Sequence, residues 1–170
     1  MQTTSLKLYS LEYGKIGTYW IAALFILGNV ALPQLCHLMP MGGVRWLPIY
    51  FFTLVGAYKY GWRLGVITAL VSPLVNSFIF DMPHVSALPA IMLKSTLLAG
   101  IAGYTASKFR KASLLLLAVV VLAYQLLGSF GEWLMGDSVY AAIQDFRIGL
   151  PGMAVQVFGG WIVINCLLRR

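Results

Sequence analysis

Residues 87–111 read ALPAIMLKSTLLAGIAGYTASKFRK. The first twenty, 87–106, are almost wholly apolar, and about 20 such residues are what an α-helix needs to cross the roughly 30 Å hydrocarbon core of a bilayer. Three basic residues follow closely, Lys108, Arg110 and Lys111, and a basic cluster of this kind ends a membrane span on its cytoplasmic side. The stretch therefore predicts a transmembrane helix with one unusual member, Lys94, which lies inside the span.

Five further apolar stretches accompany this one. Of the 170 residues, 60% are hydrophobic and 10% are charged, and the mean hydropathy is +0.84. A water-soluble domain of this size needs far more polar surface. We therefore expect an all-α integral membrane protein, a single membrane domain over 1–170, whose six transmembrane helices lie at about 17–38, 46–60, 64–80, 87–106, 113–135 and 149–168. Residues 1–15 are expected to form a short interfacial helix.

The second and third of these spans are short, with 15 and 17 residues. One long re-entrant feature over 46–80 is therefore an alternative to two helices. Lys59, Gly61, Trp62 and Arg63 interrupt the apolar run in its middle. Such a polar turn favours two short spans.

The basic residues divide unevenly between alternate loops. One side receives nine of them, whereas the other side receives only Arg45 and Arg147; the nine are Lys7, Lys15, Lys59, Arg63, Lys108, Arg110, Lys111, Arg169 and Arg170. Short loops rich in Lys and Arg stay in the cytoplasm. Both termini are therefore predicted to be cytoplasmic, and the protein is expected in a bacterial cytoplasmic membrane. The net charge of +7 reflects this topology and attraction to anionic lipid rather than binding to nucleic acid.

Polar side chains gather in the outer half of the predicted bundle. An unpartnered polar group in the membrane is costly, so these side chains should face one another or a cavity. The functional interpretation is an outward-facing pocket for a polar small molecule, and the alternative is ordinary hydrogen bonding between helices. The candidate binding residues are Asn29, His37, Arg45, Asn76, Lys94, Gln125, Glu132 and Gln156.

Three features sharpen this expectation. Lys94 is predicted to meet an anionic group of the substrate, to pair with Glu132 or Asp81, or to extend to the interface with no ligand. Gln125, Ser129 and Glu132 recur at i, i+4 and i+7 and so share one helix face. Pro33 frees the carbonyl four residues earlier, that of Asn29, and predicts a kink.

The loop over 36–45 is too apolar to extend into solvent, and we expect it to fold back over the outer mouth of the bundle. It carries Cys36, His37, Met39 and Met41, a set that suggests a soft metal. Adjacent residues rarely close a metal site alone, so no metal and no cofactor is predicted, with an axial ligand to a corrinoid or haem as the alternative. No nucleotide-binding loop, HExxH motif or nucleophile–base spacing occurs, so the chain is not expected to be an enzyme.

Several runs resemble the substrate-binding S components of energy-coupling factor transporters: LPIY at 47–50, GVITA at 65–69, SPLVN at 72–76 and the segment 89–103. The resemblance implies capture of a vitamin or related micronutrient from outside. It implies a cap at 36–45 over a pocket lined by Lys94, Gln125, Glu132 and Gln156. It also implies docking onto a transmembrane coupling subunit that carries two ATPase subunits.

The docking surface of that family is commonly a row of small residues in the first span. This chain has only Thr18 and Ala22 at that spacing, so a second row, Ser95, Ala99 and Gly103, is the alternative surface. Two other function classes stay open on the residues alone. One is an autonomous secondary transporter or channel, and the other is a membrane scaffold without a ligand.

Overall fold

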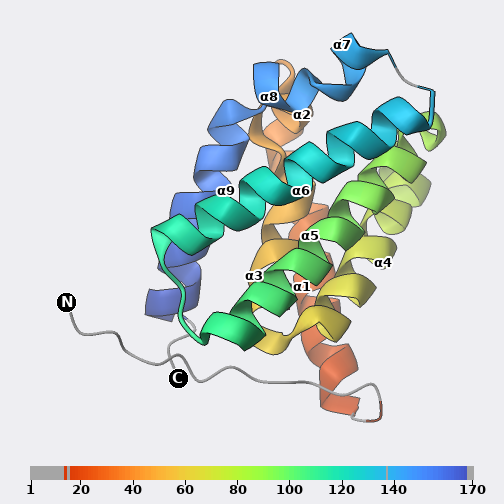
Figure 1. The fold of residues 1–170 in the computed structure, drawn as a ribbon. Coiled ribbons are helices and arrows are strands. Elements are labelled where there is room, and N and C mark those ends of the chain that lie inside the picture. The colour runs from red at the N-terminus through yellow and green to blue at the C-terminus, as the bar shows by residue number, and fades with distance from the viewer. Residues whose placement is uncertain (1–13, 15, 137, 168–170) are drawn as a thin grey trace.

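The computed structural model describes residues 14, 16–136 and 138–167, and this part of the chain is helical, without a strand (Figure 1). Most of the segment for which an interfacial helix was expected, together with Lys7, Lys15, Arg169 and Arg170, lies outside the described residues. The longer helices are α1 (Ile16–His37), α3 (Phe51–Tyr60), α4 (Trp62–Phe80), α5 (Leu88–Phe109), α6 (Leu114–Leu134) and α9 (Leu150–Ile162). The shorter elements are α2 (Gly42–Trp46), η1 (Pro48–Tyr50), η2 (Val85–Ala87), α7 (Val139–Ala142), α8 (Gln144–Arg147) and η3 (Val163–Leu167), the last of which continues α9 as a π-helix.

The six longer helices run up and down through one bundle (Figure 1). The short helices α2, α7 and α8 lie together at one end, which we name the cap end. The first turn of α1 and the end of α9 lie at the opposite end, which we name the base end. Successive long helices therefore alternate in direction, as expected for a chain that crosses a layer repeatedly.

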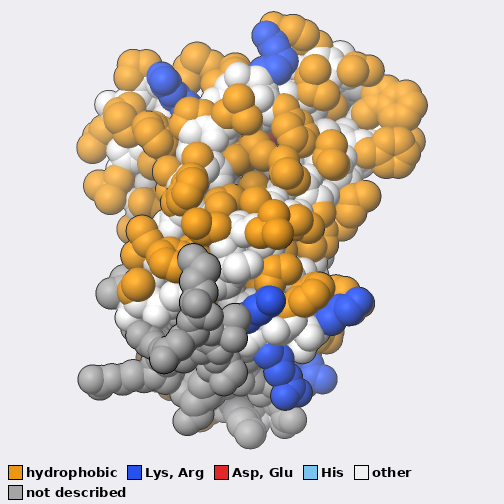
Figure 2. All heavy atoms as spheres, turned by 60° about the vertical axis from the view of Figure 1, so that its left-hand side comes forward, with side chains coloured by type: hydrophobic (Ala, Val, Ile, Leu, Met, Phe, Trp, Pro, Cys, Tyr) orange, Lys and Arg blue, Asp and Glu red, His pale blue; other side chains and the backbone are white. Residues whose placement is uncertain are grey.

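Four helical segments are long and apolar enough to cross a membrane: Ile16–His37, Trp62–Phe80, Val85–Phe109 and Leu114–Leu134. Large apolar side chains cover the outside of the bundle, including Phe78 at 92% and Leu115 at 75% exposure. Figure 2 shows hydrophobic side chains over most of the visible described surface, with Lys and Arg near the upper and lower ends of the molecule. Contact of so much apolar surface with water is unfavourable, whereas contact with hydrocarbon is not. The four long apolar segments and the apolar outer surface are therefore features of a helical membrane protein.

The other two helices of the bundle, α9 and α3, are shorter than these four segments. The apolar segment Leu150–Cys166 approaches spanning length, whereas the ten residues of α3 rise only about 15 Å. The expected span over 46–60 begins late because Leu47 adopts a left-handed conformation with φ 47° and Pro48 starts a new turn. Proline has no N–H to continue the preceding helix, so α2 ends there and α3 begins at Phe51.

Two separate helices occupy the region for which a re-entrant feature was the alternative. Helix α3 ends at Tyr60 and α4 begins at Trp62, with Gly61 between them at φ 97°, a conformation that favours glycine. Lys59 and Arg63 flank this turn, Lys59 in the last turn of α3 and Arg63 in the first turn of α4. Lys59 is 1% exposed, so this basic residue is buried in the bundle and does not lie in a loop.

The two rows of small residues lie inside the bundle and not on its surface. Thr18, Ala22, Ser95 and Ala99 are each at most 1% exposed. Gly103 is also buried, and a β-carbon there would overlap the backbone of Trp62. Small residues do permit close helix approach, but here the approaching helices belong to the same chain. In this structure the expected docking residues therefore offer no surface to a partner.

Candidate ligand site at the cap end

The amides of α1 and α4 form a hydrogen-bonded network close to Pro33. The carbonyl oxygen of Asn29, which Pro33 leaves without its helical partner, accepts from Asn76 Nδ2 at 2.9 Å. The Asn29 side chain donates to Thr53 Oγ1 at 2.9 Å and accepts from the backbone N–H of Phe52 at 3.1 Å. The sequence prediction of a freed carbonyl at Asn29 is therefore confirmed.

This amide network satisfies its own members. Asn76 Oδ1 accepts from Gln34 Nε2 at 3.3 Å, and Asn76 Nδ2 also donates to the carbonyl of Ser72 at 3.1 Å. Asn29 and Asn76 are both fully buried. Their geometry matches the interpretation of hydrogen bonding between helices, so these two residues position α1, α3 and α4 rather than line a pocket.

A buried ion-pair triad joins α5, α6 and α8. Lys94 Nζ lies 2.7 Å from Glu132 Oε2 and 2.8 Å from Asp145 Oδ2. The exposed fractions of the three side chains are 3% for Lys94, 11% for Glu132 and 13% for Asp145. The expected pairing of Lys94 with Glu132 is therefore confirmed, whereas Asp81, the other expected partner, is exposed.

The side chain of Lys94 reaches the triad by crossing α6 at Gly128. A β-carbon at Gly128 would overlap Lys94 Cγ, so glycine is required for the lysine to lie flat against that helix. Gln125, Ser129 and Glu132 flank this crossing, and all three are buried. Their spacing predicted one shared face, and the structure confirms it.

A second polar group, centred on Tyr124, lies deeper in the bundle. The Tyr124 hydroxyl donates to Gln156 Oε1 at 2.8 Å and accepts from Gln125 Nε2 at 3.2 Å. The ring of Tyr124 packs against that of Tyr50, with centroids 5.5 Å apart. Gln125 and Gln156 come from different helices, α6 and α9, so this hydroxyl joins two residues that the sequence proposed as ligand-binding.

Within the described part of the chain, four buried polar atoms of α5, α6 and α9 have no hydrogen-bond partner. They are Ser95 Oγ, Gln125 Oε1, Ser129 Oγ and Gln156 Nε2. A buried group without a partner costs about 1–3 kcal/mol. The amide network around Asn29 has no such deficit, so the two polar regions differ in kind. The region around Tyr124 and the triad has unused hydrogen-bonding capacity for a ligand or water.

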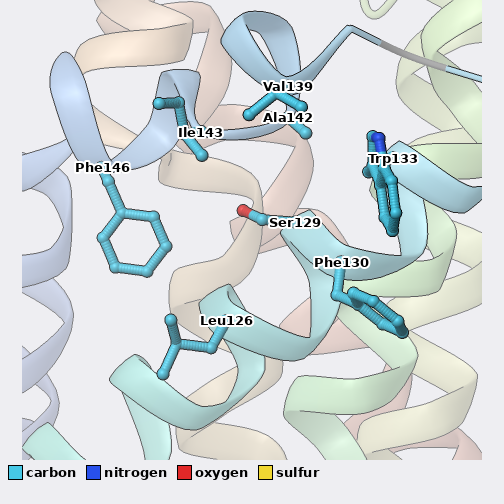
Figure 3. A pocket seen from close by; sticks show the side chains of 8 residues that line it. All are labelled: Leu126, Ser129, Phe130, Trp133, Val139, Ala142, Ile143 and Phe146. Carbon is cyan, nitrogen blue, oxygen red and sulfur yellow. The ribbon is translucent and has the colours of Figure 1, made fainter.

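An apolar groove of about 440 Å³ opens beside the triad, between α6 and the α7–α8 segment. Figure 3 shows the hydroxyl of Ser129 directed toward its centre, with apolar side chains around it. Trp133 and Phe146 directly follow Glu132 and Asp145 in sequence, so the groove and the triad share helix α6 and the α7–α8 segment, although no triad residue lines the groove. The groove is lined by Leu126, Ser129, Phe130, Trp133, Val139, Ala142, Ile143 and Phe146.

The last part of the loop after α1, helix α2, packs onto α9. The backbone of Trp46 and Leu47 lies so close to Gly152 in α9 that a β-carbon there would overlap it. A separate hollow of about 400 Å³ is formed within the loop by residues 37–44. The loop is therefore packed against α9 and closes one side of the cap end.

None of the contacts among the described residues joins His37 or Arg45 to the triad. His37 Nδ1 lies 2.7 Å from the carbonyl oxygen of Pro33 in its own helix, and Arg45 is exposed. Of the eight candidate binding residues, the structure pairs Lys94 with Glu132 and joins Gln125 to Gln156 through Tyr124. It places Asn29 and Asn76 in the amide network, His37 at the end of α1 and Arg45 in α2.

Sequence reasoning missed Asp145 and Tyr124. The one signal for Asp145 in the sequence is a carboxylate in a segment that also carries the apolar residues Ile143 and Phe146. Tyr124 was the only hydroxyl-bearing residue in the aliphatic run 114–128. A buried tyrosine hydroxyl usually finds a hydrogen-bond partner, and that rule would have linked it to the neighbouring Gln125.

The chain was compared with protein-family models, curated proteins and solved structures. No family model, no curated protein and no solved structure matches it.

Proposed function

We propose that this chain is the substrate-binding membrane subunit of an energy-coupling factor type importer, which captures a vitamin or related micronutrient at the cap end. A partner module then drives uptake with ATP. One observation carries the proposal. Gln125, Ser129 and Gln156 carry buried polar atoms without a partner among the described residues, and α6 carries Gln125 and Ser129 together with Glu132 of the ion-pair triad and one wall of an open groove. Buried polar groups in a membrane protein ordinarily satisfy one another, so a surplus of this kind suits a ligand.

In this proposal the cap end faces outward, and both termini lie in the cytoplasm of a bacterial cell. The described basic residues Arg63, Lys108 and Lys111 belong to the base end, whereas Arg45 and Arg147 belong to the cap end. The imbalance follows the rule that basic loops remain inside. Helices α3 and α9 complete six crossings with the four longer segments, and the cap loop with η1 makes up the length that α3 lacks.

Capture is favoured over an autonomous channel by the polar groups nearer the base end. Thr68 donates to the carbonyl of Leu64 at 3.0 Å, and Asn165 donates to the carbonyls of Trp161 and Ala112. These side chains are occupied by backbone groups, so they offer no continuation of the cap-end site. A one-sided site requires a partner to release its ligand inward. That role suits a transmembrane coupling subunit with two ATPase subunits.

The experiment is a medium-depletion assay in bacteria that express the chain with or without an energy-coupling module. Mass spectrometry of the spent medium should show at least one small molecule that is depleted only when both are present. The matched control replaces the triad by neutral residues, Lys94→Met with Glu132→Gln and Asp145→Asn, and should abolish the depletion. Depletion by the chain alone would indicate an autonomous transporter, and no depletion in any strain would contradict a transport role.

A further inference from the structure

The groove between α6 and the α7–α8 segment contains a hydroxyl group that the fold leaves unpaired. Ser129 is 7% exposed, and its hydroxyl has no hydrogen-bond partner among the described residues. A serine within a helix commonly donates to the carbonyl four residues earlier, and the Ser129 hydroxyl does not make that bond. Figure 3 shows it directed toward the centre of the groove. A buried hydroxyl therefore faces an open hollow.

The walls of the groove carry no charge and are rich in aromatic rings. Of the eight described residues that line it, Ser129 and Trp133 alone have a polar side-chain atom, and three are aromatic: Phe130, Trp133 and Phe146. The rings of Phe130 and Trp133 lie with their centroids 5.8 Å apart. A charged group would lose its hydration here without gaining a counter-ion, whereas an aromatic body can pack against these rings in offset or edge-to-face geometry.

The α7–α8 wall of the groove is held by contacts of its own. The guanidinium carbon of Arg147 in α8 lies 3.8 Å from the ring centroid of Tyr140 in α7, which joins the two short helices. Asp145 in α8 is tied to α5 through Lys94, at 2.8 Å. Phe146, which lines the groove, directly follows Asp145. The groove is therefore formed without a ligand, as small-molecule sites usually are.

Neither water nor a lipid chain completes this groove well. A buried water typically makes about three hydrogen bonds, more than the polar side-chain atoms of Ser129 and Trp133 offer, and it would leave the apolar walls wet. A lipid acyl chain has the converse defect, because it covers the walls but has no polar atom for the Ser129 hydroxyl. A molecule with an apolar body and a single polar group satisfies both parts of the groove.

We propose that the groove is a binding site for an uncharged aromatic molecule with one hydrogen-bonding group. The Ser129 hydroxyl bonds that group, and the apolar walls cover the aromatic body. The volume of about 440 Å³ lies within the range of roughly 300–1,000 Å³ that small-molecule sites occupy. Because no triad residue lines the groove, binding here needs neither the triad charges nor a coupling module. The inference therefore goes beyond the proposed function.

The test uses three probes that share one bicyclic body: naphthylmethanol, methylnaphthalene and naphthylacetate. The full chain is placed in phosphatidylcholine nanodiscs, and binding is measured by calorimetry with empty nanodiscs as the blank. Ser129→Ala should weaken naphthylmethanol by about threefold to tenfold, the factor that one uncharged hydrogen bond contributes. The same variant should change methylnaphthalene, which has no hydroxyl, by less than about twofold. Naphthylacetate should bind the wild type at least about tenfold more weakly than naphthylmethanol.

Matched variants separate the groove from the rest of the bundle. Ser95 is also buried, and its hydroxyl has no partner among the described residues, but it does not line the groove; Ser95→Ala should leave the binding of naphthylmethanol unchanged. Ile143→Trp fills the groove from a lining position that is 39% exposed and should weaken naphthylmethanol and methylnaphthalene by at least about tenfold. Ile79→Trp makes the same change at an exposed position of α4 outside the groove and should affect neither probe.

Four results would overturn the inference. They are an equal effect of Ser129→Ala on naphthylmethanol and methylnaphthalene, unchanged binding in Ile143→Trp, naphthylacetate that binds as tightly as naphthylmethanol, and no binding of naphthylmethanol. A phospholipid that co-purifies with the chain and that naphthylmethanol does not displace would assign the groove to lipid, which also contradicts the proposal.

The failure of this inference and the failure of the proposed function give different results. If a compound is depleted from the medium only with the coupling module but naphthylmethanol does not bind, the importer role stands and the groove site is wrong. If naphthylmethanol binds as described but no compound is depleted in any strain, the groove site stands and the importer role is wrong.

Discussion

Replacing Lys94 by methionine is expected to lower the stability of the protein by about 3–5 kcal/mol. The substitution leaves Glu132 and Asp145 with no ammonium group between them, in a region where their side chains are 11% and 13% exposed. Two buried carboxylates without a shared cation repel each other and lack their counter-charge. Thermal unfolding in detergent should show a fall in the midpoint of about 10 °C, from the scaling for chains of this size.

The matched control for Lys94→Met is Lys108→Met in the same helix. Lys108 is exposed and contacts Tyr104 at the surface, with Nζ 3.4 Å from the tyrosine hydroxyl. Exposed contacts of this kind contribute about 0–1 kcal/mol, so this variant should unfold near the wild-type midpoint. Similar midpoints for the two variants would show that the triad is not a buried charge cluster.

The triple variant Lys94→Met, Glu132→Gln and Asp145→Asn should recover most of the stability that Lys94→Met loses. Replacing a whole buried ion-pair cluster by neutral groups of similar size is often neutral for stability, whereas removing one partner is not. The triple variant therefore separates folding from ligand binding. It should be folded, and it should have lost the charges that the proposed site uses.

Replacing Asn76 by leucine is expected to destabilise the protein by about 2–3 kcal/mol, because the carbonyl of Asn29 loses the donor that compensates for Pro33. Gln34 loses its acceptor in the same step. The measurement is again thermal unfolding. Pro33 has no N–H to donate to the carbonyl of Asn29, and Asn76 supplies the donor in its place.

Pro33→Ala provides the test of that origin. Alanine at position 33 restores an N–H that can donate to the carbonyl of Asn29, so the loss caused by Asn76→Leu should be smaller in the Pro33→Ala background. A double-mutant cycle should give a coupling of about 1 kcal/mol in this direction. Strictly additive effects would contradict the assignment of Asn76 as the partner of the carbonyl that Pro33 frees.

Apolar length predicted most of the fold. The stretches expected at 17–38, 87–106 and 113–135 correspond to α1, α5 and α6 within three residues at each end, because a run of about 20 apolar residues has few other ways to satisfy its backbone in a membrane. The stretch at 46–60 behaved differently. Its boundary depends on the left-handed conformation of Leu47 and on packing of the loop against Gly152, which only the assembled bundle determines.

The sequence alone did not reveal which residues of the site pair with one another. The spacing of Gln125, Ser129 and Glu132 defined a polar face, because helix periodicity is a local property. The third member of the triad, Asp145, reaches Lys94 across 51 positions of sequence, and the path of the α7–α8 segment that brings it there is set by tertiary packing. Gly103 shows the same limit, since its small size predicts a close neighbour but not that the neighbour is Trp62.

In the proposed function, the cap end binds a small molecule through the triad and the unpartnered polar atoms of α6 and α9. The most direct test is mass spectrometry of compounds released from the purified full chain, with the neutral triple variant purified in parallel. The account predicts one compound near equimolar amount in the wild-type sample and its loss from the folded triple variant. The same compound in equal amount in both samples, or no compound in the wild type, would contradict it.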